Sequence, residues 1–403
     1  MRRPSGRRIG YAFAAVAVAL LAAAAVVLAS SGSSSDPAPE PAVAVPPAGS
    51  PGPRCDALAT STEDVTSALS DASPGEVICV ADGTYPEVGL EGEFLGAGVE
   101  VRAENPGGAT IEGATISGVG ITLARFRIDG EVVIEPESKK VTIAHDTISG
   151  GYLGIDACNS DQATCDDVEI IGNKIEGPLG EDGIRANRYH DGDGDGVGLL
   201  VEGNEFTGIR ENGNHSDCLQ AVWTGDHLIF RKNYLHDNRC QGFFVKDQDA
   251  LCGQGIEGVC GPVEGLRVED NLMVRNHEPC AEGGTACGQP IYMHIFGPYT
   301  DAVIAHNTIW GDHLDSQLAL REGVPAGTKV EANAIYRFWT DTDATKADFR
   351  DNTLCILEGE WPKQRPGMTV ACTPPFQDPA ADDYRLPDGR GVDWAPAEEH
   401  YGP

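Results

Sequence analysis

LRVEDNLM, at residues 266–273, is the clearest copy of a pattern that decides the fold. Apolar residues alternate in its first half, an Asn follows, and apolar residues then resume. Period-2 alternation is typical of a β-strand with one buried face, and no copy is followed by an apolar stripe of helical length. The other copies are VTIAHDTI (141–148), VEIIGNKI (168–175), LLVEGNEF (199–206), LIFRKNYL (228–235), AVIAHNTI (302–309), TKVEANAI (328–335) and ADFRDNTL (347–354).

Each copy carries one Asn or Asp at the same place, and consecutive stations lie 19 to 38 residues apart. This spacing is in the range of solenoid repeats. A strand that repeats without a helix can bury its apolar face only by stacking on the next copy, about 4.8 Å away. Stacked Asn side chains would then form a hydrogen-bonded ladder. The stations are Asp146, Asn173, Asn204, Asn233, Asn271, Asn307, Asn333 and Asn352.

Three further segments carry a resemblance to a known superfamily. PGEVICVADGTYPEVGL (74–90) looks like the first turns of secreted polysaccharide lyases, and DYRLPDG (383–389) resembles their closing segment. TEDVTSALSDA (62–72) reads as a short amphipathic helix with Ser61 or Thr62 as its N-cap. The chain thus resembles the right-handed parallel β-helix, or pectate-lyase-like, superfamily. The resemblance implies an all-β single right-handed parallel β-helix with a short N-terminal capping helix and an irregular C-terminal cap.

The N-terminus has the order of an export signal, because four arginines precede an apolar run from Tyr11 to Ala29. Residues 1–29 are predicted to be a signal peptide or an N-terminal membrane anchor, so the protein is secreted or held at the cell surface. Residues 30–54 are rich in Pro, Ser and Ala and predict a disordered linker. The remaining predicted parts are an N-terminal cap (55–74), the β-helix domain (75–355) and a C-terminal cap or tail (356–403).

The 12 cysteines are even in number and follow an export signal, which favours disulfide bonds over metal ligands. Sequence does not fix their connectivity. Their local clustering suggests the pairs Cys55–Cys79, Cys158–Cys165, Cys218–Cys240, Cys252–Cys260, Cys280–Cys287 and Cys355–Cys372.

A second strand in each coil supplies the candidate site. Its copies are EDGIRANR (181–188), SDCLQAVW (216–223), CQGFFVKD (240–247), GQPIYMHI (288–295) and DSQLALRE (315–322). Aligned by eye, they place Lys246, His294 and Arg321 in one outward column. A neighbouring outward column holds Arg185, Gln220, Phe244 and Tyr292.

Such a row suits a uronic-acid lyase, which abstracts the proton α to a carboxylate and must stabilise the enolate that forms. The resemblance implies Lys or Arg in these tasks, with Lys246 as the base and His294 and Arg321 as carboxylate binders or proton donors. The alternative is that these are solvated polar residues on an exposed face, because a register error of one residue inverts the columns.

Asp182 and Asp217 occupy equivalent positions on adjacent coils, where adjacent rungs bring two carboxylates about 5 Å apart. They could contact substrate, bind Ca²⁺ or act as a glycosidase pair. The alternative is that each Asp closes its own turn.

DGDGDGVGLLVE (191–202) fits the spacing of a calcium loop. Asp191, Asp193, Asp195 and Glu202 are the predicted ligands. Since a strand follows rather than a helix, we expect a Ca²⁺ loop on a β-helix turn. The alternative is a flexible acidic loop.

The net charge of −33 argues against nucleic acid as a partner, because phosphates need a basic surface. The sequence predicts a monomer that meets the membrane only through its N-terminal segment. Its expected partner is an extracellular polysaccharide, cleaved by β-elimination across a uronic-acid linkage. The alternative is a non-catalytic carbohydrate-binding or cell-surface structural protein.

Overall fold

The computed structural model describes residues 55–396 apart from short gaps. The chain divides into two units, residues 1–46 and 47–403, and every described residue lies in the second. The predicted export segment and linker therefore lie outside the described residues. Within the described part, no helix is long and apolar enough to span a bilayer. The gaps are 159–162, 211–215, 223–224, 239, 247–262, 275–291, 297–298, 312–316, 322–326, 341–346 and 360–367.

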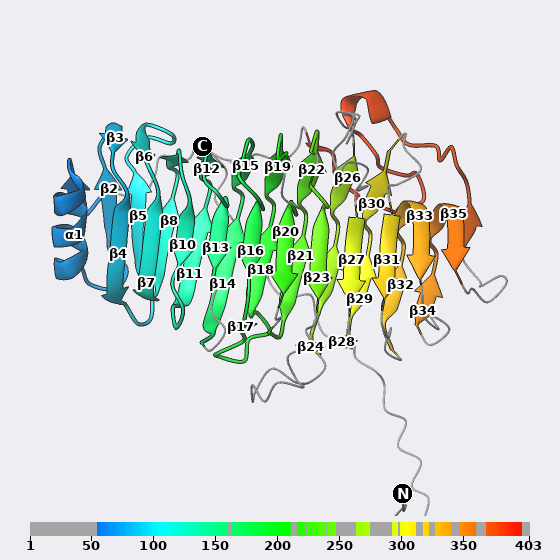
Figure 1. The fold of residues 1–403 in the computed structure, drawn as a ribbon, viewed down its shortest axis with the longest axis horizontal. Coiled ribbons are helices and arrows are strands. Elements are labelled where there is room, and N and C mark those ends of the chain that lie inside the picture. The colour runs from blue at the N-terminus through cyan, green and yellow to red at the C-terminus, as the bar shows by residue number, and fades with distance from the viewer. Residues whose placement is uncertain are drawn as a thin grey trace, which may run out of the picture. The chain divides into compact units, whose positions relative to one another are not determined.

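The described residues wind into coils whose strands pair in parallel with the coil before and the coil after (Figure 1). Three stacks of strands result, which we name sheets 1, 2 and 3. Sheet 1 contains β4 (Val88–Glu93), β7 (Ala114–Val119), β10 (Val132–Ile134), β13 (Ile155–Ala157), β16 (Ile184–Ala186), β20 (Leu219–Val222), β23 (Phe243–Lys246), β27 (Tyr292–Phe296), β31 (Gln317–Arg321) and the second halves of β33 (Ala334–Thr340) and β35 (Thr353–Gly359).

Sheets 2 and 3 complete each coil. Sheet 2 contains β1 (Ala57–Ala59), β2 (Val77–Val80), β5 (Val99–Ala103), β8 (Ile121–Ala124), β11 (Lys139–Ala144), β14 (Cys165–Ile171), β18 (Leu199–Glu202), β21 (Leu228–Arg231), β25 (Arg267–Glu269), β29 (Val303–Ala305), β32 (Lys329–Glu331) and β34 (Asp348–Arg350). Sheet 3 contains β3 (Gly83–Tyr85), β6 (Ala109–Ile111), β9 (Arg127–Ile128), β12 (Thr147–Ser149), β15 (Lys174–Glu176), β19 (Glu205–Thr207), β22 (Tyr234–His236), β26 (Leu272–Val274), β30 (Thr308–Trp310), the first halves of β33 and β35, and β36 (Thr369–Val370). Outside the three sheets, β17 (Tyr189–His190) pairs with β14, β24 (Val263–Glu264) pairs with β28 (Tyr299–Thr300), and η2 (Pro379–Ala381) is a 3₁₀ turn.

The Asn stations lie between sheets 2 and 3 and form the predicted ladder. Asn173 accepts through Oδ1 from the Asp146 backbone N–H (2.9 Å) and donates through Nδ2 to the Ile143 carbonyl oxygen (2.9 Å). The same pattern repeats at Asn204 and on to Asn352, where every station side chain is buried. The inward Val, Ile and Leu side chains fill the core. These pairings confirm the predicted all-β parallel β-helix.

The N-terminal end of the solenoid is covered by α1 (Thr62–Asp71). Ser61 is its N-cap, and the Ser61 hydroxyl oxygen accepts from the Asp64 backbone N–H (3.1 Å). Val65 and Leu69 face the first coil, and each is 1% exposed. The helix therefore closes the core that an open first coil would expose to water.

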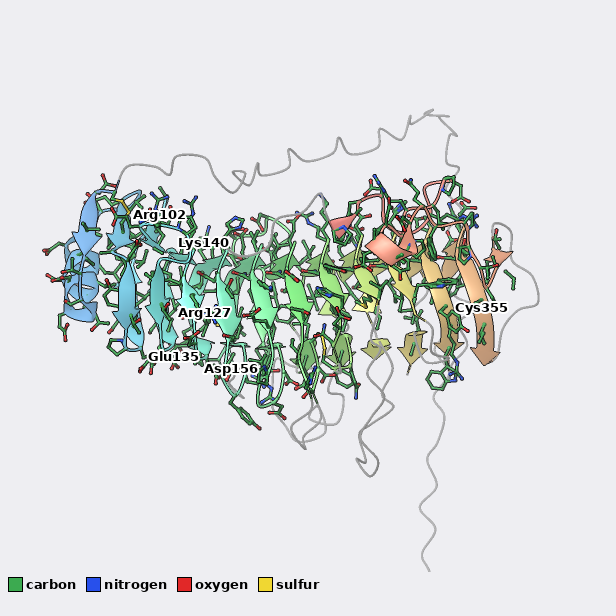
Figure 2. The ribbon with its side chains drawn as sticks, turned by 90° about the horizontal axis from the view of Figure 1, so that it is seen from above. Arg102, Arg127, Glu135, Lys140, Asp156 and Cys355 are labelled. Atoms are coloured by element: carbon green, nitrogen blue, oxygen red, sulfur yellow. A yellow bond between two sulfur atoms is a disulfide. The ribbon has the colours of Figure 1, made fainter. Side chains whose placement is uncertain are left out.

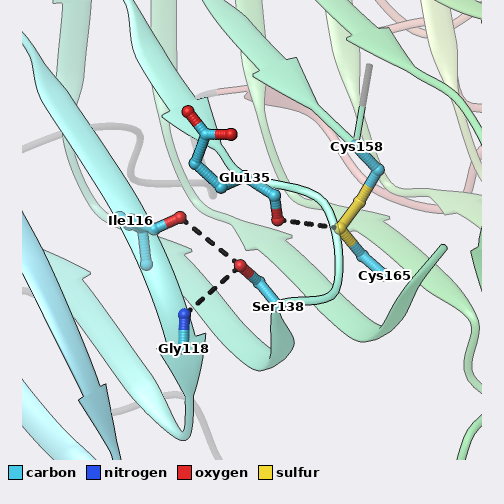
Figure 3. Close-up of a disulfide and its surroundings, with 6 residues drawn as sticks. All are labelled: Ile116, Gly118, Glu135, Ser138, Cys158 and Cys165. Carbon is cyan, nitrogen blue, oxygen red and sulfur yellow. Dashed lines mark hydrogen bonds between the residues drawn. A yellow bond between two sulfur atoms is a disulfide. The ribbon is translucent and has the colours of Figure 1, made fainter. Parts of the chain in front are cut away.

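Four of the six predicted disulfides fall on described residues, and all four are present: Cys55–Cys79, Cys158–Cys165, Cys218–Cys240 and Cys355–Cys372. The other two pairs, Cys252–Cys260 and Cys280–Cys287, lie outside the described residues. Figure 3 shows the Cys158–Cys165 bond, with Cys165 Sγ 3.4 Å from the Glu135 carbonyl oxygen. Three of these bonds link segments that are paired side by side in the coil stack, and Cys158–Cys165 links the consecutive strands β13 and β14 of one coil.

Residues 368–396 begin with β36 of sheet 3 and then pack on the outward face of that sheet, where they build a second hydrophobic core (Figure 1, orange to red). We call these residues the C-terminal strap. The Tyr234 hydroxyl donates to Asp382 Oδ2 (2.5 Å), and Trp394 Nε1 donates to the Asp270 carbonyl oxygen (2.8 Å). The second core comprises Tyr234, Leu272, Val274, Trp310, Tyr384, Val392 and Trp394.

Candidate functional site

The outward face of sheet 1 carries one continuous column across adjacent coils. Arg185 pairs with Gln220, and Gln220 pairs with Phe244. Buried residues flank each of them along its strand, so all three lie on the outward face. The register therefore places these three predicted residues on adjacent rungs, as the sequence indicates.

The predicted row of Lys246, His294 and Arg321 is not one row. His294 pairs with Phe244 and Ala319, whereas Lys246 and Arg321 both pair with Phe296. The alignment of 288–295 is therefore wrong by two residues, and Met293 rather than Ile291 continues the buried column. A two-residue shift keeps every side chain on the same face, so alternation alone does not reveal it.

The corrected register changes which positions are neighbours. Lys246 and Arg321 are separated by one rung, which corresponds to about 9–10 Å, and His294 lies two residues along the strand from Phe296. Tyr292 pairs with Gln317 rather than lying beside Phe244. The side chains of these four predicted residues lie outside the described part of the structure.

Arg185 is held by two carboxylates at the N-terminal side of this column. Its Nη2 lies 2.7 Å from Glu181 Oε2 and 2.8 Å from Asp182 Oδ2. Asp182 is fully buried, and burial together with the charge of Asp217 raises the pKa of Asp182 to about 7. At neutral pH this network therefore contains a carboxyl group that is only partly ionised.

The predicted Asp182–Asp217 pair exists, but both side chains are 0% exposed. Asp182 Oδ1 accepts from the Asp217 backbone N–H (2.8 Å), and Asp217 Oδ2 accepts from Gln220 Nε2 (2.7 Å). These bonds join consecutive turns and orient Gln220. The alternative in which each Asp closes a turn fits this geometry, since neither carboxylate faces the surface on which a sugar would lie.

The acidic loop brings together a different set of carboxylates from the predicted one. Ligand oxygens of Asp167, Asp191 and Asp193 lie within 4.8 Å of one another. Glu202 instead makes an ion pair with Arg231 Nη2 (2.8 Å) on the outward face of sheet 2. The EF-hand spacing fails here because a strand rises about 3.3 Å per residue and carries Glu202 away from the loop.

Asp191 shapes the loop, since its carboxylate accepts from the backbone N–H groups of Gly194 (2.6 Å) and Gly196 (2.9 Å). Lys140 Nζ lies 2.6 Å from Asp193 Oδ2. A cation bound by this cluster would compete with the Lys140 ammonium for Asp193. In Figure 2, Lys140 lies on one side of the solenoid and Asp156 of sheet 1 on the other, so the cluster is separate from the column of sheet 1.

Sequence reasoning missed Asp167 and Tyr152. Asp167 stands before the strand repeat VEIIGNKI, one coil ahead of the acidic loop, and aligning the turns as well as the strands would have indicated it. Tyr152 lies in the turn before β13, in the sequence GYLG, and is 53% exposed. An aromatic residue between two glycines in a turn is the available signal.

No protein-family model matches the chain, and no curated protein matches it. Solved structures do resemble it. A variant of the family 6 alginate lyase AlyGC aligns at 14% identity and a TM-score of 0.36, covering 84% of this chain and 58% of the lyase. A mannuronic-acid-specific family 6 lyase from human gut microbiota aligns at 16% and 0.42, covering 85% and 97%.

The catalytic unit of a GH87 α-1,3-glucanase from Streptomyces thermodiastaticus aligns at 14% identity and a TM-score of 0.42, covering 82% of this chain and 69% of the glucanase. At such identities no substrate is carried over to this chain. The strand pairing described above establishes the parallel β-helix fold of this chain.

Proposed function

We propose that the protein binds an extracellular polysaccharide along the outward face of sheet 1 and cleaves it by β-elimination at a uronic-acid linkage. The observation that carries the proposal is the column Arg185, Gln220, Phe244 and His294, which stacks polar and aromatic positions on adjacent rungs. Such a column offers a sugar chain hydrogen-bond donors and an apolar ring surface along its length.

Lys246 is the proposed base. It would take the proton α to the uronate carboxylate, and the electron pair left behind would form a double bond as the glycosidic C–O bond breaks. The leaving oxygen then takes up a proton, with His294 as the proposed donor. Arg321 would bind the substrate carboxylate, whose charge grows as the enolate forms.

The test incubates purified protein with pectate, alginate and chondroitin and follows the ultraviolet absorbance of the unsaturated product. We expect Lys246→Ala to lower the rate by roughly a hundredfold or more, as loss of a positioned base does. Lys329→Ala is the matched control, because Lys329 is an exposed lysine on sheet 2. Absence of product from every polyuronate would contradict the cleavage proposal.

The second candidate is a protein that binds or displays carbohydrate without cleaving it. One observation favours it: Arg185, in the described part of the column, is neutralised by Glu181 and Asp182. A net charge of −33 also disfavours long acidic substrates. Retained polysaccharide binding without product formation, unchanged in Lys246→Ala, would support this candidate.

Three companion proposals complete this function. Ca²⁺ is the proposed cation of the acidic loop, where Asp167, Asp191 and Asp193 offer the oxygen ligands that calcium prefers. Residues 1–29 would direct export and leave the protein secreted or anchored at the cell surface. The protein would act as a monomer.

A further inference from the structure

Tyr152 is a fixed, exposed aromatic side chain at the edge of sheet 1. It is 53% exposed and is the only aromatic residue among the exposed large hydrophobic side chains of the described chain. Gly180 of the next coil leaves space for it, because a Cβ there would lie 2.6 Å from Tyr152 Cδ2. The two turns are joined by backbone bonds from Gly180 N to the Gly151 oxygen (3.1 Å) and from Glu181 N to the Tyr152 oxygen (2.7 Å).

Polar groups surround this ring on the side of sheet 1. The Tyr152 hydroxyl is hydrogen-bonded to Glu181, which raises the pKa of Tyr152. Glu181 also pairs with Arg185, whose side chain is 20% exposed. An aromatic face beside a carboxylate and a guanidinium is a combination that binds a pyranose, since the ring takes its C–H face and the polar groups take its hydroxyls.

The charge around Tyr152 restricts which sugar fits. Glu131 lies near Asp156 and Arg185, and burial raises the pKa of Glu131. Arg185 is already paired with two carboxylates, Glu181 and Asp182. A uronate placed over Tyr152 would therefore meet the Glu181 carboxylate at short range, which costs binding free energy. The carboxyl groups of the network are Glu131, Asp156, Glu181, Asp182 and Asp217.

We propose that Tyr152, Glu181 and Arg185 form a subsite for a sugar ring that carries no carboxylate. The inference rests on the proposed binding of polysaccharide to sheet 1 and narrows it. The acidic part of the column, around β13 and β16, takes an uncharged ring, and uronate binding is confined to the part around β23, β27 and β31. The expected ligand is a polysaccharide that contains both neutral and uronic-acid residues.

The test is calorimetric titration of the full chain with hexasaccharides. Cellohexaose, laminarihexaose and xylohexaose are the neutral probes, and hexamannuronate and hexagalacturonate are the acidic ones, each measured with Ca²⁺ and with EDTA. We expect at least one neutral probe to bind, and Tyr152→Ala to weaken it roughly threefold to tenfold through loss of ring stacking. Tyr152→Phe keeps the ring and should keep most of the affinity. Leu95→Ala, at an exposed apolar residue elsewhere, should change nothing.

Glu181→Gln separates a binding role from a structural one. It removes one negative charge and leaves Asp182 as the carboxylate paired with Arg185, so we expect the affinity for the acidic probes to rise relative to the affinity for the neutral ones. Three outcomes would overturn the proposal: no neutral probe binds, Tyr152→Ala leaves neutral binding unchanged, or acidic probes bind through Tyr152 as tightly as neutral ones. Because cleavage is tested separately with Lys246→Ala, Tyr152-dependent neutral binding without cleavage would reject only the proposed lyase activity.

Discussion

Asp146 is the first station of the Asn ladder. It carries a carboxyl group where every later station carries an amide. Asp146 Oδ1 accepts from the Phe126 backbone N–H (2.6 Å), as the Asn stations do with their own neighbours. Asp146 Oδ2 occupies the place of the Asn amide nitrogen, is buried, and has no hydrogen-bond partner among the described residues. Burial raises the pKa of Asp146 well above its usual range. Burial therefore favours the neutral acid, whose shape resembles that of an asparagine amide.

Asp146→Asn should stabilise the protein at pH 7 by roughly 1–3 kcal/mol, because the amide supplies the missing donor without a bound proton. The direction of the pH dependence follows from the pKa of Asp146, which is higher in the folded state than in the unfolded state. Because burial favours the protonated form of Asp146 in the folded state, the stability of the folded protein falls as the pH rises above about 3.9, the pKa of an unfolded Asp. The increase in unfolding free energy caused by Asp146→Asn should therefore be smaller at pH 4 than at pH 7. Urea unfolding at both pH values measures it.

His145 precedes Asp146 in the chain, and burial together with the charge of Arg125 lowers the pKa of His145. Asn173→Asp is the matched control: it should destabilise at pH 7 and recover in acid. Equal destabilisation by Asp146→Asn at both pH values would contradict the neutral-acid assignment.

At the scale of the element, we predict that calcium bound to the acidic loop between β17 and β18 raises the thermal midpoint of the protein. EDTA should lower the thermal midpoint by a few degrees, because a ligand that binds only the folded state stabilises it. Asp193→Ala should abolish that sensitivity. Lys140→Ala should instead raise the calcium affinity, since it removes the ammonium group that lies 2.6 Å from Asp193. Asp71→Ala, in α1, serves as a neutral comparison.

If neither EDTA nor added Ca²⁺ changes the thermal midpoint, the proposed calcium site is ruled out. Differential scanning fluorimetry of the four proteins is sufficient to decide.

The alternation of apolar and polar residues predicts some properties of the strands and not others, because it reports only which face of a strand is buried. Alternation identified the strands and the outward faces, and Asn identified the bend, because each is a local property of the chain. It did not fix the pairing of β27, since a shift of two residues puts the same faces outward. The spacing of an EF-hand loop assigned Glu202 to calcium, although the same residue lies in a predicted strand; a strand carries Glu202 away from the loop, so the strand prediction outweighs the spacing.

At the scale of the whole molecule, the strap links residues that are far apart in sequence. Trp394 lies edge-on to Tyr234, with ring centroids 6.5 Å apart, and is 5% exposed. Trp394→Ala should cost about 3 kcal/mol or more of unfolding free energy, as truncation of a buried Trp does. Val370→Ala, in the same strap but 68% exposed, should change stability by no more than about 0.5 kcal/mol.

Hydrogen exchange separates local from global effects of Trp394→Ala. We expect the amide of Val392, bonded to Thr308 Oγ1, to lose protection before the ladder amides do. Simultaneous loss of both would show that the strap and the coils unfold as one unit. The signal for this element is present in the sequence: NLMV (271–274) is apolar on both faces, and NTIW (307–310) places Trp310 outward, so the outward side needs a cover.

Each coil pairs only with the coil before it and the coil after it. The number of coils can therefore change without altering coils that lie far from the change. A duplication or deletion of one complete winding would extend or shorten the outward face of sheet 1 by a single step of about 4.8 Å and leave remote windings untouched. The reach of that face is therefore set by the number of turns, and the helix that covers the first winding can stay the same.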